Sequence, residues 1–245
     1  MILPAAHDTA SAILAMPSTD PDTVYISSGT WSLLGVELDA PDRSDSSRRN
    51  NFTNEGGFGG KTCYLTNIMG LWMIQSLRKE LLEQCIELSF AELCTLAERE
   101  SIPSIIPCNH DRFLSPDSMI GEIQRACAES EQMVPQTPAQ LAAVVYRSLA
   151  ACYGEAVSQL RESRGKPYSS LSIIGGGSNA AYLNRLTAET TGCTVYVGPG
   201  EATAIGNAAA QMLSFGELGS VPEIRECVRR SFDVTVVQKS EIRKS

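Results

Sequence analysis

The sequence predicts an α/β fold with a block of helices inserted partway along the chain. The continuous apolar run at 171–174 leads directly into a glycine triplet, as a fully buried parallel strand leads into a turn and a helix. Two short apolar segments at 23–26 and 31–36 flank a small-residue turn, which is typical of a hairpin. Between residues 67 and 163, apolar residues recur at three- and four-residue spacing, which predicts amphipathic helices.

The first part of the chain predicts one helix, the hairpin and a further strand. The Ala-rich segment after Asp8 favours a helix, which Pro17 would end. The segment after Pro41 is rich in Ser, Asp and Arg, as surface loops are. In order, we expect a helix at 8–15, strands at 23–26 and 31–36, a surface loop at 41–51 and a strand at 61–65.

The rest of the chain predicts the helical block, followed by alternating strands and helices. Ser89 and Glu92 have the spacing of a capping box, and Thr137 with Pro138 suits the start of the longest helix. We find no internal repeat and no linker, so we expect a single domain over residues 1–245. In order, we expect helices at 67–84, 89–100, 116–128 and 137–163, a strand at 171–174, a helix at 179–190, a strand at 195–197 and a helix at 201–214.

Composition excludes several classes of function. The net charge of -8, without a basic cluster, argues against nucleic-acid and anionic-membrane partners, and no apolar run approaches the ~18 residues of a membrane span. The eight cysteines form no CxxC pair, so we expect reduced core thiols in a cytoplasmic protein. With only two histidines, we expect no protein-bound metal site.

Asp8 is the candidate general base. Transfer of a phosphoryl group to an alcohol needs a carboxylate that orients the hydroxyl and accepts its proton. Asp8 lies between His7 and Thr9, which suit contact with a polyol. The alternative is that Asp8 is only the N-cap of its helix, a role for which aspartate is also well suited.

Two small-residue turns are candidates for binding phosphate. The segment 27–30 could close its backbone amides on phosphate oxygens, although an ordinary hairpin turn has the same composition. The triplet 175–177 joins a buried strand to a helix N-terminus, where amides and the helix dipole favour an anion. A dinucleotide site is disfavoured because the next strand, at 195–197, is followed by Gly-Pro-Gly rather than by an acidic residue.

Asn67 and Gln75 are further candidates for ligand contacts. We expect both on the helix at 67–84, with Asn67 at its tip and Gln75 on its side, about 80° away. The alternatives are an N-cap for Asn67 and a solvated position for Gln75. We expect Trp31 and Trp72 to be core anchors rather than sugar platforms.

Taken together, these segments resemble the rhamnulokinases of the FGGY family of carbohydrate kinases, which belongs to the actin-like ATPase superfamily. The resemblance covers nearly the whole chain, and five motifs in register are far more specific than any one of them. The motifs, in order, are His7-Asp8-Thr9-Ala10-Ser11, Ser27-Ser28-Gly29-Thr30-Trp31-Ser32, Phe52-Thr53-Asn54-Glu55-Gly56-Gly57, Asn67-Ile68-Met69-Gly70-Leu71-Trp72 and Gly175-Gly176-Gly177.

The resemblance implies a ribonuclease H-like lobe that transfers the γ-phosphoryl group of ATP to the 1-hydroxyl of L-rhamnulose, with Mg²⁺ on the phosphates. It implies Asp8 as the general base and His7, Asp8, Thr9 and Asn67 as sugar contacts. It also implies that Thr30, Gln75, Gly176 and Gly177 bind ATP. Two alternatives remain: a related kinase of fuculose or xylulose, and a non-catalytic lobe that binds nucleotide or sugar.

The resemblance covers the C-terminal lobe only. The candidate base stands at position 8, so we expect an N-terminal kinase lobe to be absent from these residues. Two lobes are needed to exclude water and align the transfer, and the chain alone is therefore expected to be nearly inactive. An unpaired lobe interface would leave apolar surface exposed, from which we expect self-association.

Overall fold

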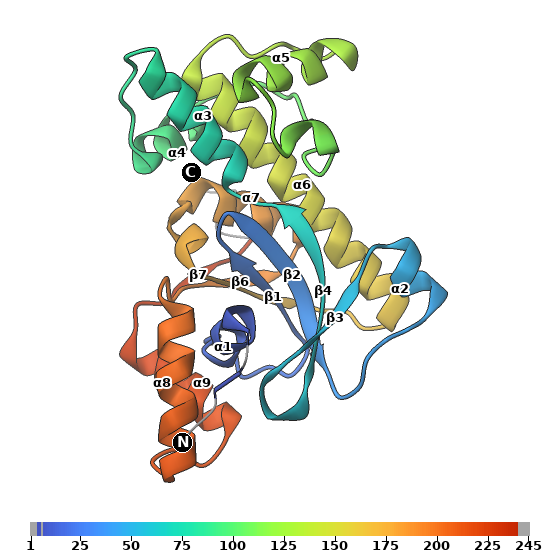
Figure 1. Ribbon diagram of the computed structural model, residues 1–245, viewed down its shortest axis with the longest axis vertical. Helices are drawn as coiled ribbons and strands as arrows, with labels where there is room; N and C mark the ends of the chain where they lie inside the picture. The colour runs from blue at the N-terminus through green and yellow to red at the C-terminus, as the bar shows by residue number, and fades with distance from the viewer. Residues whose placement is uncertain (1–3, 6, 240–245) are drawn as a thin grey trace.

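In the computed structural model, which describes residues 4, 5 and 7–239, a seven-stranded sheet has helices on both faces (Figure 1). The strand order is β3-β4-β2-β1-β5-β6-β7. Strands β1, β5 and β6 run parallel, and the other neighbouring pairs are antiparallel. The strands are β1 (Thr23–Ser28), β2 (Trp31–Leu38), β3 (Thr53–Gly56), β4 (Thr62–Met69), β5 (Ser170–Ile174), β6 (Thr194–Val197) and β7 (Thr235–Val237).

Alternation along β1 explains why both faces of the sheet are covered. Val24 and Ile26 point into one core cluster, whereas Tyr25 points into the other. The first cluster is covered by the long helix α6 (Pro138–Arg164) and by α7 (Ala181–Thr191). The second cluster is covered by α1 (Asp8–Leu14), α8 (Ala202–Phe215) and α9 (Val221–Ser231).

The predicted helical block lies between β4 and β5 and packs with α6 at one end of the molecule (Figure 1). It contains α3 (Trp72–Glu83), α4 (Phe90–Glu98) and α5 (Met119–Glu129). The capping box at Ser89 and Glu92 is confirmed, and the Thr137 side chain caps α6. Single turns of 3-10 helix occur at η1 (Phe58–Gly60), η2 (Asp111–Phe113) and η3 (Gly176–Asn179).

Three expectations about elements were wrong. The expected loop at 41–51 contains the short helix α2 (Asp45–Arg49), which the Ser44 side chain caps. The strand expected at 61–65 continues to Met69, so that α3 begins only at Trp72. Beyond residue 214, where no element was expected, the chain forms α9 and β7.

The predicted buried parallel strand is confirmed. β5 pairs with β1 on one side, in the register Ile26 to Ile173, and with β6 on the other. All of its residues are buried. None of the helices described here has the length and apolar character that crossing a membrane requires.

Candidate functional site

Three loops meet at the edge of the sheet where the parallel strands β1, β5 and β6 end. They are the turn between β1 and β2 at 29–30, the glycine turn at 175–177 and the segment 198–200 before α8. The amide of Gly175 donates to the carbonyl of Pro199 at 3.1 Å. The carboxyl ends of the parallel strands therefore bring together the two turns, at 27–30 and 175–177, that the sequence predicts as phosphate-binding candidates.

The glycine turn packs against the end of β1 so closely that a side chain would not fit. A Cβ on Gly177 would lie 1.9 Å from Ser28 Oγ, and one on Gly175 would lie 2.8 Å from Ser28 O. Gly175 also has a φ of 87°, which favours glycine. Glycine at these positions is thus what allows the two turns to touch.

The same β1–β2 turn holds the start of α3. The amides of Leu71 and Trp72 donate to the carbonyls of Gly29 and Thr30, each at 3.1 Å. A Cβ on Gly70 would lie 2.7 Å from Thr30 O. At Gly70, the backbone that leads into α3 therefore crosses the backbone of the β1–β2 turn at close range.

A cavity of about 520 Å³, here called the edge cavity, opens above these turns. All the residues predicted to bind ATP, namely Thr30, Gln75, Gly176 and Gly177, lie in its wall. They come from the β1–β2 turn, α3 and the glycine turn. The other residues in its wall are Gly29, Leu71, Ile74, Phe90, Ala91, Tyr146, Asn179 and Ala180.

Sequence reasoning missed the aromatic and aliphatic part of this wall. Phe90 at the start of α4 is 46% exposed, and its ring packs against the Arg78 guanidinium, 4.9 Å from the ring centroid. Tyr146 on α6 is buried, and burial raises the pKa of its hydroxyl well above the usual range, so it stays protonated. Phe90 adjoins a capping box, but no local motif marks it as a wall residue. Together with the glycine amides, this wall could bind a ligand that has an aromatic ring and phosphates.

The predicted catalytic segment forms the N-terminus of α1. His7, not Asp8, is the N-cap, since His7 Nδ1 accepts the Thr9 amide at 3.2 Å. Asp8 Oδ1 accepts the same amide at 2.8 Å, and the Asp8 side chain is 77% exposed. Thr9 is buried. Thr203 Oγ1 in the first turn of α8 donates to Asp8 O at 3.3 Å, which places Asp8 at the carboxyl edge of β6.

Asn67 lies on the same face of the sheet as α1, but not on a helix as expected. It is exposed in β4 and pairs with Leu33 of β2, and Leu33 packs against the cluster under α1. Paired residues of neighbouring strands project to one face, so Asn67 projects to the α1 side. The expectation that Asn67 and Gln75 share one helix is wrong, because the strand runs on to Met69.

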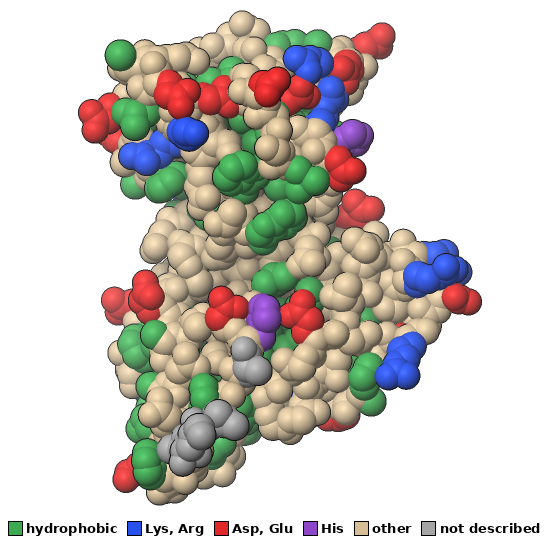
Figure 2. Space-filling view, in the orientation of Figure 1, with side chains coloured by type: hydrophobic (Ala, Val, Ile, Leu, Met, Phe, Trp, Pro, Cys, Tyr) green, Lys and Arg blue, Asp and Glu red, His purple; other side chains and the backbone are tan. Residues whose placement is uncertain are grey.

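The tryptophans also differ from expectation. Trp31 follows the β1–β2 turn and is 45% exposed, so it is not a core anchor. It projects to the same face as Leu33, two residues along β2. Trp72 packs against the core and its Nε1 donates to Phe113 O at 3.1 Å. Figure 2 shows hydrophobic side chains exposed in the middle of this view, below the helical block.

The predicted site residues thus fall into two groups. Thr30, Gln75 and the glycine turn line the edge cavity, whereas His7, Asp8 and Asn67 lie on the α1 side of the same sheet edge. Among the residues that the structure describes, no three His, Cys, Asp or Glu side chains form a cluster that could hold a metal ion.

Comparisons with known proteins identify the family. Residues 24–215 match the C-terminal domain of the FGGY family of carbohydrate kinases. A rhamnulokinase from Oceanobacillus iheyensis is 43% identical over 98% of this chain and 50% of its own length. One from Bacillus subtilis is 41% identical over 98% of this chain and 49% of its own length. The chain spans about half the length of these curated relatives.

Solved structures share the fold. Plasmodium falciparum glycerol kinase with ADP matches 97% of this chain and 47% of its own, with a TM-score of 0.66 at 15% identity. Xylulose kinase from Rhodospirillum rubrum matches 95% of this chain and 45% of its own, with a TM-score of 0.65 at 15% identity. The expected ribonuclease H-like, actin-like ATPase fold is thereby confirmed.

Proposed function

This chain belongs to the FGGY family of carbohydrate kinases, and from that premise we propose that it is the C-terminal lobe of a rhamnulokinase. The proposed reaction is transfer of the γ-phosphoryl group of ATP to L-rhamnulose, which gives L-rhamnulose 1-phosphate. The reaction would take place in the cytoplasm, where free thiols such as the eight described here persist.

The observation that carries the proposal is the composition of the edge cavity. Thr30, Gln75 and Gly177 are far apart in the sequence, yet all three line this one cavity. A wall that contains both a phenyl ring and a glycine turn suits a purine nucleotide. The amides near the β1–β2 turn would then face the phosphates.

Asp8 would act as the general base. Its carboxylate is exposed and stands in the first turn of α1. It would accept the proton of the sugar hydroxyl as that oxygen attacks the γ-phosphorus. His7, Thr9 and Asn67 would supply the sugar contacts, with Thr9 beneath the surface at the capped end of the helix.

Mg²⁺ would enter with the nucleotide. Magnesium in kinases is held by substrate phosphates, waters and one or two carboxylates rather than by a cage of side chains. Because the Asp8 carboxylate is reserved for the sugar proton, phosphate oxygens and waters would hold the ion. The ion would neutralise charge on the phosphates during transfer.

We also propose that turnover needs a second lobe. The chain spans 50% of the length of the Oceanobacillus iheyensis relative, and the side chains of His7 and Asp8 are exposed. A facing lobe would exclude water and complete the sugar pocket. Without the second lobe, the chain would bind nucleotide but would convert ATP to ADP very slowly or not at all.

The test is an ADP-release assay with MgATP and L-rhamnulose, L-fuculose or D-xylulose as the acceptor. We would compare this chain alone with the chain fused behind the N-terminal half of the Oceanobacillus iheyensis relative. We expect turnover only in the fusion, with L-rhamnulose preferred. A fusion that binds ATP but phosphorylates none of the three sugars would overturn the proposed reaction.

A further inference from the structure

Cys108 and Cys152 lie against each other where the helical block meets α6. Their Sγ atoms are 2.8 Å apart, and Cys108 Sγ also lies 3.7 Å from Ser148 O. Cys108 belongs to the segment between α4 and α5, whereas Cys152 lies within α6. The two sulfurs are therefore in direct contact.

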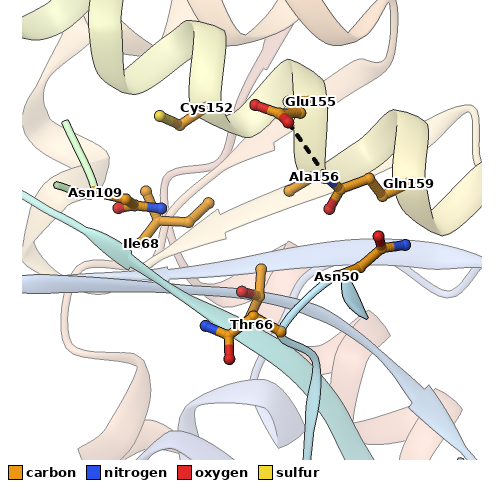
Figure 3. A pocket seen from close by; sticks show the side chains of 9 residues that line it. Asn50, Thr66, Ile68, Asn109, Cys152, Glu155, Ala156 and Gln159 are labelled. Atoms are coloured by element: carbon orange, nitrogen blue, oxygen red, sulfur yellow. Dashed lines mark hydrogen bonds between the residues drawn. The ribbon is translucent and has the colours of Figure 1, made fainter. Parts of the chain in front are cut away.

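A cavity of about 150 Å³, here called the α6 cavity, reaches Cys152 (Figure 3). Cys152 forms part of its wall, with Glu155 and Gln159 further along α6 and Asn109 opposite. The volume exceeds the ~30 Å³ share of one water molecule. The wall is rich in side-chain amides. A small polar reagent could therefore reach Cys152, whereas Cys108 is completely buried.

We propose that Cys108 and Cys152 are a reversible thiol–disulfide site that reacts with peroxides entering the α6 cavity. With hydrogen peroxide, the Cys152 thiolate would attack one oxygen and break the O–O bond, so that Cys152 becomes a sulfenic acid. The released hydroxide would take up the proton that the Cys152 thiol had lost and leave as water. Cys108 would then attack the Cys152 sulfur, and its proton would leave with the sulfenic oxygen as a second water. Both thiols are oxidised and the peroxide is reduced, so two electrons are balanced.

The surroundings of the pair assign the two roles. Hydrogen bonding from Cys108 and the backbone amides of Cys108 and Asn109 lower the pKa of Cys152, against burial and the Glu155 charge. The same hydrogen bond, together with burial, raises the pKa of Cys108. Cys152, which is also the accessible member, is thus the attacking thiol and Cys108 the resolving one.

A Cys108–Cys152 disulfide would fix the segment around residues 106–109, which contacts the end of β4 beside the edge cavity. Ile106 donates to Ser148 Oγ of α6 at 3.0 Å, and Asn109 Oδ1 accepts the Met69 amide at 2.7 Å. Met69 ends β4, immediately before the backbone crossing that starts α3. A disulfide would add a covalent bond to these contacts and constrain the unfolded chain.

The experiment exposes the chain to hydrogen peroxide, alkylates the remaining thiols and digests it without reductant for mass spectrometry. We expect a Cys108–Cys152 linked peptide, which dithiothreitol removes, and a thermal unfolding midpoint raised by several degrees. In Cys108→Ser, dimedone should label Cys152 as a sulfenic acid. Cys85→Ser, which removes an exposed thiol, is the matched control and should form the bond as the wild type does.

The proposal fails if Cys108 and Cys152 remain alkylated separately at peroxide concentrations that oxidise the exposed Cys85. It also fails if Cys152 passes directly to the sulfinic acid while Cys108 stays reduced. The main result, the linked peptide, is measured in the wild-type chain. The test therefore stays decisive even if the Cys108→Ser variant does not fold.

Discussion

At the scale of single residues, two aspartates show how position separates a functional from a structural carboxylate. Asp8 is 77% exposed in the first turn of α1, and its Oδ1 accepts the neighbouring Thr9 amide. Asp42 accepts the Ser44 amide at 2.8 Å and pairs with Arg164 Nη1 at 2.6 Å. Its side chain is only 13% exposed, which ties it to the fold.

Replacing Asp8 should affect the reaction far more than stability. We expect Asp8→Asn in the two-lobed fusion to lower kcat about 10²- to 10⁴-fold, because the amide cannot accept the hydroxyl proton. The melting temperature should hardly change. Asp45→Asn is a matched control, since Asp45 is an exposed first-turn residue of α2. Equal loss of kcat in both variants would argue against Asp8 as the base.

Replacing Asp42 should affect stability and its pH dependence. The Ser44 amide and hydroxyl, and then Arg164, lower the pKa of Asp42 below its ordinary value. Its stabilisation is therefore complete above the unfolded pKa of about 3.9 and is lost as pH falls through the lower folded pKa. We expect Asp42→Asn to lower the free energy of unfolding by about 1 to 2 kcal/mol at pH 7.

Urea unfolding of both proteins from pH 7 down to pH 2 checks this expectation. The difference between wild type and Asp42→Asn should shrink below pH 4, because a protonated Asp42 resembles asparagine. Asp39→Asn, which removes a highly exposed partner of Lys61, should show a smaller difference that salt screens. A constant difference across this pH range would contradict the assigned role of the Asp42 charge.

At the scale of elements, strong local patterns predicted the fold well and polar or mixed segments did not. The capping box at Ser89 and the run at 171–174 each had one physical interpretation, and both were confirmed. β3 escaped prediction because it is a largely exposed edge strand with no apolar alternation. The predicted start of α3 was wrong because Ile68 fits the apolar spacing of a helix. In the structure, Ile68 is buried within β4, where it pairs with Ser32 of β2.

Contacts between elements explain why the candidate site was predicted only in part. Glycine and hydroxyl residues in a turn can be recognised from the local sequence, and this local pattern predicted Thr30 and Gly177. Phe90 and Tyr146 belong to the edge cavity only because α4 and α6 pack beside the glycine turn, a long-range event. The exposed position of Trp31 likewise depends on where the β1–β2 turn meets the rest of the fold.

The glycine turn offers a matched pair of substitutions. We expect Gly177→Ala to lower the free energy of unfolding by about 1 to 3 kcal/mol, because its Cβ would overlap Ser28. Gly176→Ala should change stability little, since its Cβ meets nothing within 4 Å. Chemical denaturation measures both. Adding Ser28→Gly should recover part of the loss in Gly177→Ala, and the absence of any recovery would contradict the overlap.

At the scale of the whole molecule, the sheet separates two cores and gathers function at one edge. One cluster lies under α6, α7 and the helical block, and the other lies under α1, α8 and α9. Each half of the candidate site rests on a different cluster, with the β1–β2 turn between them. A ligand in the edge cavity would therefore contact both the helical block and the sheet. Its binding should raise the free energy of global unfolding.

Nucleotide binding should raise the melting temperature of the chain even without turnover. At 100 times Kd a ligand stabilises by about 2.7 kcal/mol, which for a domain of this size is a shift of about 5 to 10 °C. We expect MgATP to produce such a shift by differential scanning fluorimetry, and Phe90→Ala to reduce it by removing one wall of the edge cavity. Phe215→Ala is the control, since Phe215 is 73% exposed at the end of α8 and lies outside that cavity. If Phe90→Ala and Phe215→Ala kept the same shift, the nucleotide would bind elsewhere, and the assignment of the edge cavity would have to be abandoned.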